Sequence, residues 1–222
     1  MIKQVVSIFW HSFPHKFRNK IDIFRRFGLW KKHKVIFIHV PKAAGVSVNK
    51  AIYGKPLGHF YAKDIKKTFP KTFNNIFTFS VVRNPIDRLY SAYNFSRKGG
   101  SPEMKMHNPE FYMNNPDFIT FERFVHNWLA FQALDKIDHV FRPQSLYLFD
   151  DHNNILVDRI YKLEEIERHY DEISKMLGKP FILGNHNKTM KKPISISTET
   201  EHCIYDLYQR DFELLGYPKL FD

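Results

Sequence analysis

Residues 35–48, VIFIHVPKAAGVSV, form the stretch that decides the fold. A short apolar run stops at a proline and Lys42, and a glycine and a serine follow before the chain becomes apolar again. This order predicts a strand over 35–40, a loop, and a helix over about 46–53. The stretch has the outline of a phosphate-binding loop. Its lysine precedes the glycine, however, so the pattern G-x-x-x-x-G-K-[ST] is absent.

A second stretch repeats this strand-to-helix arrangement. Residues 76–82, IFTFSVV, predict a strand that ends at Arg83, and a helix over about 85–96 follows. Asn84 is a favourable N-cap, and a proline suits the first helical position. Both conspicuous motifs therefore follow the end of a strand.

The rest of the chain continues the alternation of strands and helices. The patterns predict a long loop or lid at 98–117, a helix at 119–134, strands at 145–149 and 155–162, a helix at 164–177 that stops at Gly178, and a last helix with the capping box Thr198-x-x-Glu201. Such alternation predicts an α/β fold with a central, largely parallel sheet flanked by helices. Ligands of such sheets bind at the carboxyl ends of the strands.

The composition excludes several classes of protein. With 222 residues, 43% hydrophobic and 26% charged, the chain is typical of one globular domain. Its apolar runs fall short of the roughly 20 residues that a membrane-spanning helix needs. The single cysteine excludes an internal disulfide and fits a reducing compartment. We therefore expect a cytoplasmic protein.

The net charge of +11 is concentrated near the N-terminus. Residues 1–34 hold nine Lys or Arg and one acid, 9 − 1 = +8, which leaves 11 − 8 = +3 for the remaining 188 residues. The body is only mildly basic, so we expect no nucleic-acid partner. We predict that 1–34 is a basic, aromatic-rich segment and 35–222 the main domain.

This N-terminal segment contains an apolar line at helical spacing, formed by Phe17, Ile21, Phe24 and Gly28. It lacks the uninterrupted apolar core of a signal peptide. Two interpretations stay open. The helix either lies on an anionic membrane surface or packs its aromatic line against the domain and leaves its charges in water.

The two strand-end motifs carry chemistry for anions. A loop that opens a helix points backbone N–H groups at one spot, where Gly45 would let the backbone approach an anion, Ser47 would add a hydroxyl, and Lys42 a mobile charge. Arg83 and Ser91 are a suitable pair for a second phosphate, the alternative being a surface ion pair of Asp87 with Arg83 or with Arg88. Two anion sites favour a ligand with two separated anionic groups.

The segments FIHVPKAAGVS and VVRNPIDRLYSAY together resemble the cofactor motifs of the sulfotransferases that use 3′-phosphoadenosine 5′-phosphosulfate (PAPS). The nearest group is that of the heparan sulfate 2-O- and uronyl sulfotransferases and their bacterial relatives. GHFYAKDI (58–65), HVFRPQSLYL (139–148) and YQRDFELLGYP are similar to further segments of that family. The resemblance covers about 35–218 and implies a P-loop-kinase-like three-layer fold.

The resemblance also implies roles for individual residues. Lys42 would contact the sulfate, the loop would hold the 5′-phosphate, Arg83 and Ser91 would bind the 3′-phosphate, and His59 would be the catalytic base. The implied donor-binding residues are Lys42, Ala43, Ala44, Gly45, Val46, Ser47, Arg83 and Ser91. Ala43 and Val46 stand where the family usually has threonines, so two hydroxyl donors are lost.

Other polar residues near these motifs are assigned from their positions. A carboxylate such as Asp64 could orient the ring of His59, and we expect His39 to be structural. Three residues either line the acceptor site or pack at a strand edge: His139, Arg142 and Gln144.

The sequence thus predicts a PAPS-dependent sulfotransferase that sulfates a hydroxyl of a carbohydrate in polysaccharide biosynthesis, without a metal. Peripheral contact with an anionic membrane through 1–34 is compatible with it. One alternative is a small-molecule kinase, which would need a lysine after the glycine and an acid for Mg²⁺ at a strand end. Another is a basic module that only binds a membrane surface.

Overall fold

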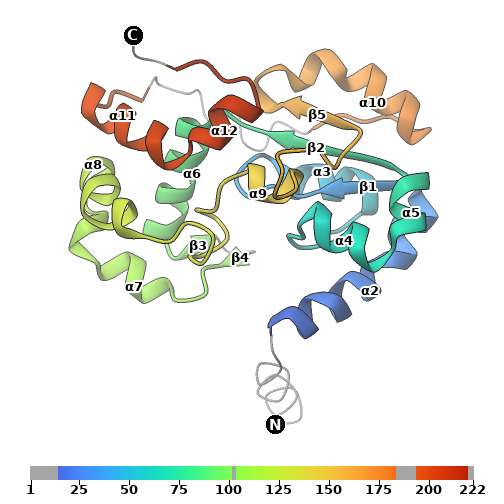
Figure 1. The fold of residues 1–222 in the computed structure, drawn as a ribbon, viewed down its shortest axis with the longest axis horizontal. Helices are drawn as coiled ribbons and strands as arrows, with labels where there is room; N and C mark the ends of the chain where they lie inside the picture. Colours follow the sequence, from blue (N-terminus) through green and yellow to red (C-terminus); the bar gives the residue numbers. More distant parts are fainter. Residues whose placement is uncertain (1–14, 102–103, 184–193, 220–222) are drawn as a thin grey trace.

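The computed structural model describes residues 15–101, 104–183 and 194–219. Its centre is a parallel sheet in the order β1-β2-β5 (Figure 1), formed by β1 (Val35–Ile38), β2 (Phe77–Val82) and β5 (Arg159–Lys162). Val35 of β1 pairs with Phe77, and Phe79 of β2 pairs with Arg159. The predicted α/β fold with a parallel sheet flanked by helices is therefore confirmed.

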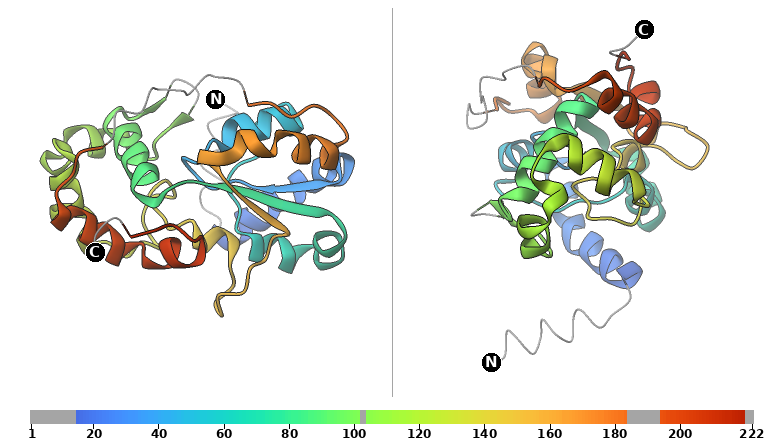
Figure 2. Two further views of the ribbon diagram at one scale, coloured as in Figure 1. Left: turned by 90° about the horizontal axis from the view of Figure 1, so that it is seen from above. Right: turned by 90° about the vertical axis from the view of Figure 1, so that its left-hand side faces the viewer.

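Helices cover the sheet and, with it, form what we call the sheet half. They are α2 (His15–His33), α3 (Gly45–Tyr53), α4 (Ala62–Thr68), α5 (Pro70–Asn75), α9 (Ser145–Leu148), the 3₁₀ segment η4 (Leu163–His169) and α10 (Tyr170–Leu177). Figure 2 shows α3 and α10 on one side of the sheet and α4 and α5 on the other. The buried apolar residues of the strands and these helices form one continuous core.

A second group of elements forms what we call the helical half. It contains the short hairpin β3 (Gly100–Ser101) and β4 (Met104–Lys105), α6 (Pro85–Arg97), α7 (Pro109–Asn114), η1 (Pro116–Phe118), α8 (Phe121–Arg123), η2 (Phe124–Trp128), η3 (Leu129–Phe131), α11 (Thr198–Leu207) and α12 (Gln209–Leu214). An aromatic-rich core holds it together. The chain passes from β2 directly into α6, so the carboxyl ends of the strands face this half (Figure 1).

Several predicted elements differ from the structure, among them the helix predicted over 119–134, which is divided into α8, η2 and η3. Residues 98–117 are not one continuous loop, because the β3–β4 hairpin and α7 lie within them. Residues 145–149 do not form a strand, because Ser145–Leu148 is the short helix α9. The predicted strand over 155–162 is shortened to β5, with an isolated bridge between Phe149 and Ile155.

The predicted helix ends are correct in part. The helix predicted over 164–177 begins as η4 and ends at Gly178, whose φ of 63° is the left-handed cap expected there. The last helix is capped by Ser197, one residue before the predicted Thr198, and its hydroxyl accepts a hydrogen bond from the N–H of Thr200. It then breaks at Tyr208 into α11 and α12.

Helix α2 packs on the domain through a different face from the one expected. Ile23 and Trp30 are each 1% exposed and belong to the core of the sheet half, whereas Phe17 and Phe24 of the predicted apolar line are 50% and 52% exposed. Residues 1–14 of the predicted N-terminal segment lie outside the described residues. The division into 1–34 and 35–222 stays a prediction. No helix in the described part of the chain is long and apolar enough to cross a membrane.

Candidate functional site

Three histidine rings lie next to one another at the carboxyl end of β1. His39 directly follows the strand, His59 lies between α3 and α4, and His139 lies before α9. The ring centroids of His39 and His59 are 4.0 Å apart, and those of His59 and His139 are 4.6 Å apart. The structure thus brings the two predicted histidines together, and adds His39, which the sequence analysis treated as structural.

The hydrogen bond of His59 fixes its tautomer. Its Nδ1 lies 3.1 Å from the carbonyl oxygen of His39. Because a carbonyl can only accept, Nδ1 carries the proton and Nε2 keeps its lone pair. Burial, and then the neighbouring His139, lower the pKa of His59 to about 3, so the ring is neutral at pH 7.

The carboxylate that we considered for orienting His59 has another partner. The Oδ2 atom of Asp64 accepts a hydrogen bond of 2.7 Å from the side chain of Asn19 on α2. The carbonyl of His39 therefore orients the ring instead. No sequence motif marks a backbone acceptor, so this partner could not be found without the fold.

His139 is held by the residue before it. Its Nδ1 lies 3.0 Å from Oδ1 of Asp138, whose side chain is nearly buried while that of His139 is 41% exposed. Burial raises the pKa of Asp138, but the hydrogen bond from His139 and further polar contacts outweigh it, and the net pKa is lowered. Asp138 is therefore ionised at neutral pH and fixes the orientation of His139.

The loop after β1 has an unusual backbone. Lys42 and Ala44 have φ angles of 66° and 60°, in the left-handed region that non-glycine residues rarely adopt. Ala44 is the N-cap of α3, and no side-chain hydrogen bond caps the helix there. The first N–H groups of α3 thus have no side-chain acceptor at the cap, which suits them to an anion.

Gly45 has a packing role that the sequence did not indicate. A Cβ atom at this position would lie 1.8 Å from Cδ2 of His39, so the imidazole fills the space that a side chain would need. The close approach of His39 is by itself a reason for a glycine here, and the expected approach of the loop to an anion stays a prediction. The other loop residues follow a simple pattern, with Ala43 buried and Val46 and Ser47 half-buried.

The ammonium group of Lys42 links the two motifs. Its Nζ lies 3.9 Å from the ring centroid of Phe95 on α6. Ser91 is half-buried one turn before Phe95 on the same face of this helix. Burial, and then the charge of Arg83, lower the pKa of Lys42 to about 8. The β1 loop and the candidate anion-binding face of α6 therefore meet.

Arg83 follows β2 with its backbone held on both sides. Its N–H donates to Oε1 of Gln144 over 3.0 Å, and its carbonyl accepts from Nε2 of Gln144 over 2.7 Å. Burial lowers the pKa of Arg83, partly offset by Asp87. Its Nε is buried and has no hydrogen-bond partner among the described residues. A guanidinium with a free, buried donor is suited to an anionic ligand.

Gln144 and Arg142, two of the residues predicted for the acceptor site, form hydrogen bonds within the protein. Gln144 is buried, and its side-chain amide bonds the backbone of Arg83, so it positions this candidate anion-binding residue. Arg142 donates to the hydroxyl of Tyr61 over 2.7 Å and to the carbonyl of Ile137 over 2.8 Å. Of the three predicted acceptor residues, His139 is the one that lies beside His59.

Two buried charged residues support the site: Asp211, which sequence reasoning missed, and Arg88, which it considered only for a surface ion pair. The carboxylate of Asp211 accepts hydrogen bonds of 2.7 and 2.8 Å from the N–H groups of Gln144 and Ser145. Arg88 of α6 donates to the carbonyl of Val140 over 2.9 Å. These contacts join segments more than 50 residues apart, which no local pattern reveals.

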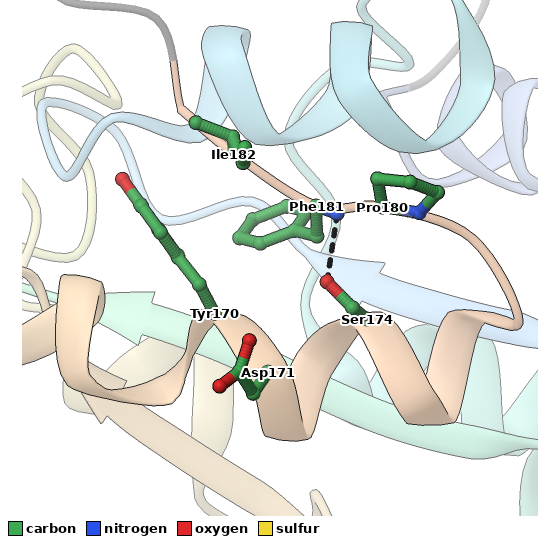
Figure 3. A pocket seen from close by; sticks show the side chains of 6 residues that line it. All are labelled: Tyr170, Asp171, Ser174, Pro180, Phe181 and Ile182. Atoms are coloured by element: carbon green, nitrogen blue, oxygen red, sulfur yellow. Dashed lines mark hydrogen bonds between the residues drawn. The ribbon is translucent and has the colours of Figure 1, made fainter.

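A separate groove of about 410 Å³ lies between α10 and residues 180–182 (Figure 3). It is lined by Tyr170, Asp171, Ser174, Pro180, Phe181 and Ile182. The hydroxyl of Ser174 accepts a hydrogen bond of 2.8 Å from the N–H of Phe181. None of the three histidines, Lys42 or Arg83 lines this groove. The candidate functional site is therefore defined by the polar groups at the strand ends and not by this groove.

Comparisons with known proteins identify a family. The family model described as "Sulfotransferase family" matches residues 25–218. The match begins ten residues before residue 35, the start of the predicted resemblance, and so includes part of α2. No curated protein and no solved structure matched the chain. Within the described ranges, no group of three or more His, Cys, Asp or Glu residues could hold a metal ion, and the expected metal-free reaction stays a prediction.

Proposed function

Since the chain belongs to the sulfotransferase family, we propose that it transfers the sulfuryl group of PAPS to a hydroxyl of a carbohydrate, with His59 as the base. The heparan sulfate sulfotransferases are one group of enzymes with this activity, and the proposal does not assign the chain to that group. Carbohydrate as the acceptor rests on the resemblance of the paired motifs, and a role in polysaccharide biosynthesis in the cytoplasm follows from it as an expectation.

The observation that carries the proposal is the pair of cations at the two strand ends. Lys42 and Arg83 are close enough for the charge of Arg83 to lower the pKa of Lys42, and burial lowers the pKa of both. Two half-buried like charges are unfavourable unless an anion lies near them. A ligand with two phosphate groups offsets this cost at both strand ends.

The remaining donor contacts follow from the same geometry. The uncapped N-terminus of α3 supplies backbone N–H groups to the 5′-phosphate. Arg83 and Ser91 are assigned to the 3′-phosphate, and Lys42 to the oxygen between sulfur and phosphorus. Because the threonines of the family pattern are replaced by Ala43 and Val46, the cradle depends on backbone groups more than on hydroxyls.

His59 is suited to remove the proton of the acceptor. As the acceptor oxygen bonds to sulfur, its proton passes to Nε2 of His59, and the bond from sulfur to the bridging oxygen breaks. The electron pair stays on the leaving phosphate, where Lys42 stabilises the charge that develops. The charges of a bound donor offset that of Lys42, so donor binding raises the low pKa of His59 and strengthens it as a base.

Calorimetric binding of 3′-phosphoadenosine 5′-phosphate without metal tests the donor site. We expect a roughly micromolar Kd for the wild type and at least tenfold weaker binding for Arg83→Ala, which is about 1.4 kcal/mol. The matched control is Arg168→Ala, whose side chain is 79% exposed on η4 and should leave the Kd unchanged. No binding by the wild type would contradict the proposal, and metal-dependent turnover of ATP would favour a kinase.

Substitution of His59 tests the base. We expect His59→Ala to reduce the release of 3′-phosphoadenosine 5′-phosphate in the presence of glycan acceptors by about 10²–10⁴-fold. The Kd for the bisphosphate should change little, because the loss affects proton transfer. His152→Ala removes an exposed histidine outside the site and serves as the control. Full activity of His59→Ala would exclude this residue as the base.

A further inference from the structure

Helix α2 presents two apolar lines, of which one is buried against the protein and the other is about half exposed. Ile23 and Trp30 are buried in the core of the sheet half, and Phe27 stacks on Phe69 with ring centroids 4.0 Å apart. The second line contains Phe17 and Phe24, which are half exposed. At 3.6 residues per turn, consecutive residues are about 100° apart, so Phe24 is turned about 100° around the helix from Ile23 and the second line flanks the buried one.

Basic side chains flank the exposed line on both sides. Lys20 and Lys31, about three turns apart, lie along one side, and Arg25 and Lys32, about two turns apart, lie along the other. All four are exposed. Over the whole of α2 there are seven Lys or Arg and a single acid, Asp22. The outward surface is therefore an apolar strip between two rows of basic side chains, of which Arg25 also pairs with Asp22 over 3.3 Å.

Packing on the domain does not account for the whole strip, because a different face of α2 makes most of the attachment and Phe24 keeps half of its surface exposed. Beside the buried Ile23 and Trp30, Asn19 donates to Asp64 over 2.7 Å and Arg26 donates to the carbonyl of Leu57 over 2.8 Å. In Figure 1, α2 lies at the periphery of the sheet half, beside β1. The strip therefore remains on the outside of the molecule.

Neighbouring helices extend the positive surface. Phe24 makes an edge contact with Phe69, with ring centroids 4.8 Å apart, and Phe69 separates α4 from α5. Lys67 precedes Phe69 and Lys71 follows it, and both are exposed. No acidic residue occurs between Lys66 and Lys71. The residue that Phe24 contacts is therefore flanked in the chain by exposed lysines of α4 and α5.

We propose that this face of α2 binds the surface of an anionic lipid membrane, with the helix axis in the plane of the interface. An apolar strip between rows of Lys and Arg lets aromatic side chains enter the headgroup boundary while the cations contact anionic headgroups. A protein partner fits less well, because lysine is depleted at the centres of protein interfaces. A double-stranded nucleic acid would be bound by the cations through its phosphates but gives no role to the apolar strip.

The attachment of α2 ties this surface to the proposed reaction. Asp64 and Leu57, its hydrogen-bond partners, lie on either side of His59 in the chain. A membrane-bound α2 would therefore hold the segment of the base at a fixed position relative to the lipid surface. This consequence rests on the proposed function, whereas membrane binding itself does not.

Co-sedimentation of the full chain with lipid vesicles tests the inference. We expect binding to vesicles that contain about one third phosphatidylserine, weakening with added salt, and little binding to pure phosphatidylcholine. Two double variants separate the contributions of the strip. Phe17→Ser with Phe24→Ser removes the apolar line, and Lys20→Gln with Lys31→Gln removes one row of charge. Each should reduce the partition coefficient at least tenfold.

A matched control distinguishes the strip from general surface properties. Phe131 is 79% exposed in the helical half and Lys136 is exposed nearby, so Phe131→Ser with Lys136→Gln removes one aromatic and one charge elsewhere. Its vesicle binding should equal that of the wild type. Unchanged melting temperature and unchanged binding of the bisphosphate would show that all variants are folded. Because binding of the bisphosphate is measured separately, a failure of the proposed donor site can be told apart from a failure of membrane binding.

Three results would overturn the inference. One is the absence of wild-type binding to anionic vesicles at low salt. Another is vesicle binding that both α2 variants retain. The third is binding of a labelled single-stranded oligonucleotide that the α2 variants abolish while vesicles are not bound, which would assign the strip to nucleic acid.

Discussion

The two strand ends that form the candidate site are built in different ways. At the end of β2, the protein satisfies its own backbone. Gln144 holds both backbone groups of Arg83, the N–H of Asn84 donates to Glu164 over 2.8 Å, and the side chain of Asn84 accepts from the N–H of Ile86 over 3.0 Å. These bonds hold Arg83 in place before any ligand arrives.

The end of β1 lacks comparable support. Lys42 and Ala44 have backbone angles in the left-handed region, and α3 begins without a side-chain cap. The ammonium group of Lys42 lies over the ring of Phe95. Such backbone conformations cost on the order of 1 kcal/mol or more each. The difference shows how the site divides its tasks. The β2 end is preorganised, and the β1 end is left unsatisfied for a ligand to complete.

The largest change in stability is expected at Asp211, which supports the β2 end through Gln144. Asp211→Asn replaces a carboxylate that accepts two backbone hydrogen bonds by an amide that can accept only one of them well. We expect the free energy of unfolding to fall by about 2 kcal/mol, measured by urea denaturation. The exposed Glu213→Gln on the same helix should change it by less than ~0.5 kcal/mol. Equal stability of both variants would mean that the β2 end does not depend on this support.

The next largest effect is a pH dependence of the free energy of unfolding that arises from Lys42 at the β1 end. The pKa of Lys42 is lowered from 10.5 to about 8 by burial and then by Arg83, so the unfolded chain holds this proton more tightly than the folded protein. The wild type should therefore gain stability from about pH 8 to 10.5. Lys42→Met should be more stable than the wild type at pH 7, by on the order of 1 kcal/mol, and this advantage should shrink over that range.

The same variant should bind the bisphosphate more weakly, because the ligand loses a cation. Urea denaturation at several pH values, together with calorimetry, measures both effects. Lys55→Met, at an exposed position, is the control and should alter the free energy of unfolding by less than ~0.5 kcal/mol throughout. A Lys42→Met protein that is less stable than the wild type at pH 7 would contradict this account of the β1 end.

The smallest effect concerns the backbone of the loop itself. Ala44 has a φ of 60°, which glycine adopts without strain, so Ala44→Gly should raise the free energy of unfolding by about 0.5–1 kcal/mol. Ala43→Gly is a matched control, because Ala43 is buried and has no positive φ; it should lower stability instead. Thermal melting of the two variants gives the comparison, and shifts of the same sign would argue against strain at Ala44.

The sequence predicts the parts of the fold that depend on neighbours in the chain. The runs before Pro41 and Arg83 form β1 and β2, Asn84 caps α6, and Gly178 ends α10, because each follows from local burial and backbone preferences. The sequence motifs also place Lys42 and Arg83 at adjacent strand ends, as the structure does.

Other parts depend on contacts between distant segments. The apolar run at 145–149 forms a helix because Asp211 holds the N–H groups of Gln144 and Ser145 at its start. Helix α2 has two apolar lines of similar spacing, and only the shape of the domain decides that Trp30 is buried while Phe24 is exposed. The orientation of His59 depends on a backbone carbonyl, which no side-chain pattern indicates.

The contact between Gly45 and His39 has a consequence for how the two halves of the reaction are coordinated. The imidazole of His39 fills the place of a side chain at Gly45, and the carbonyl of the same residue orients His59. His39 thus contacts both the loop assigned to the donor and His59, the residue assigned to proton removal. A side chain introduced at Gly45 would displace His39, so lost turnover at that position would not by itself show that the glycine touches the donor.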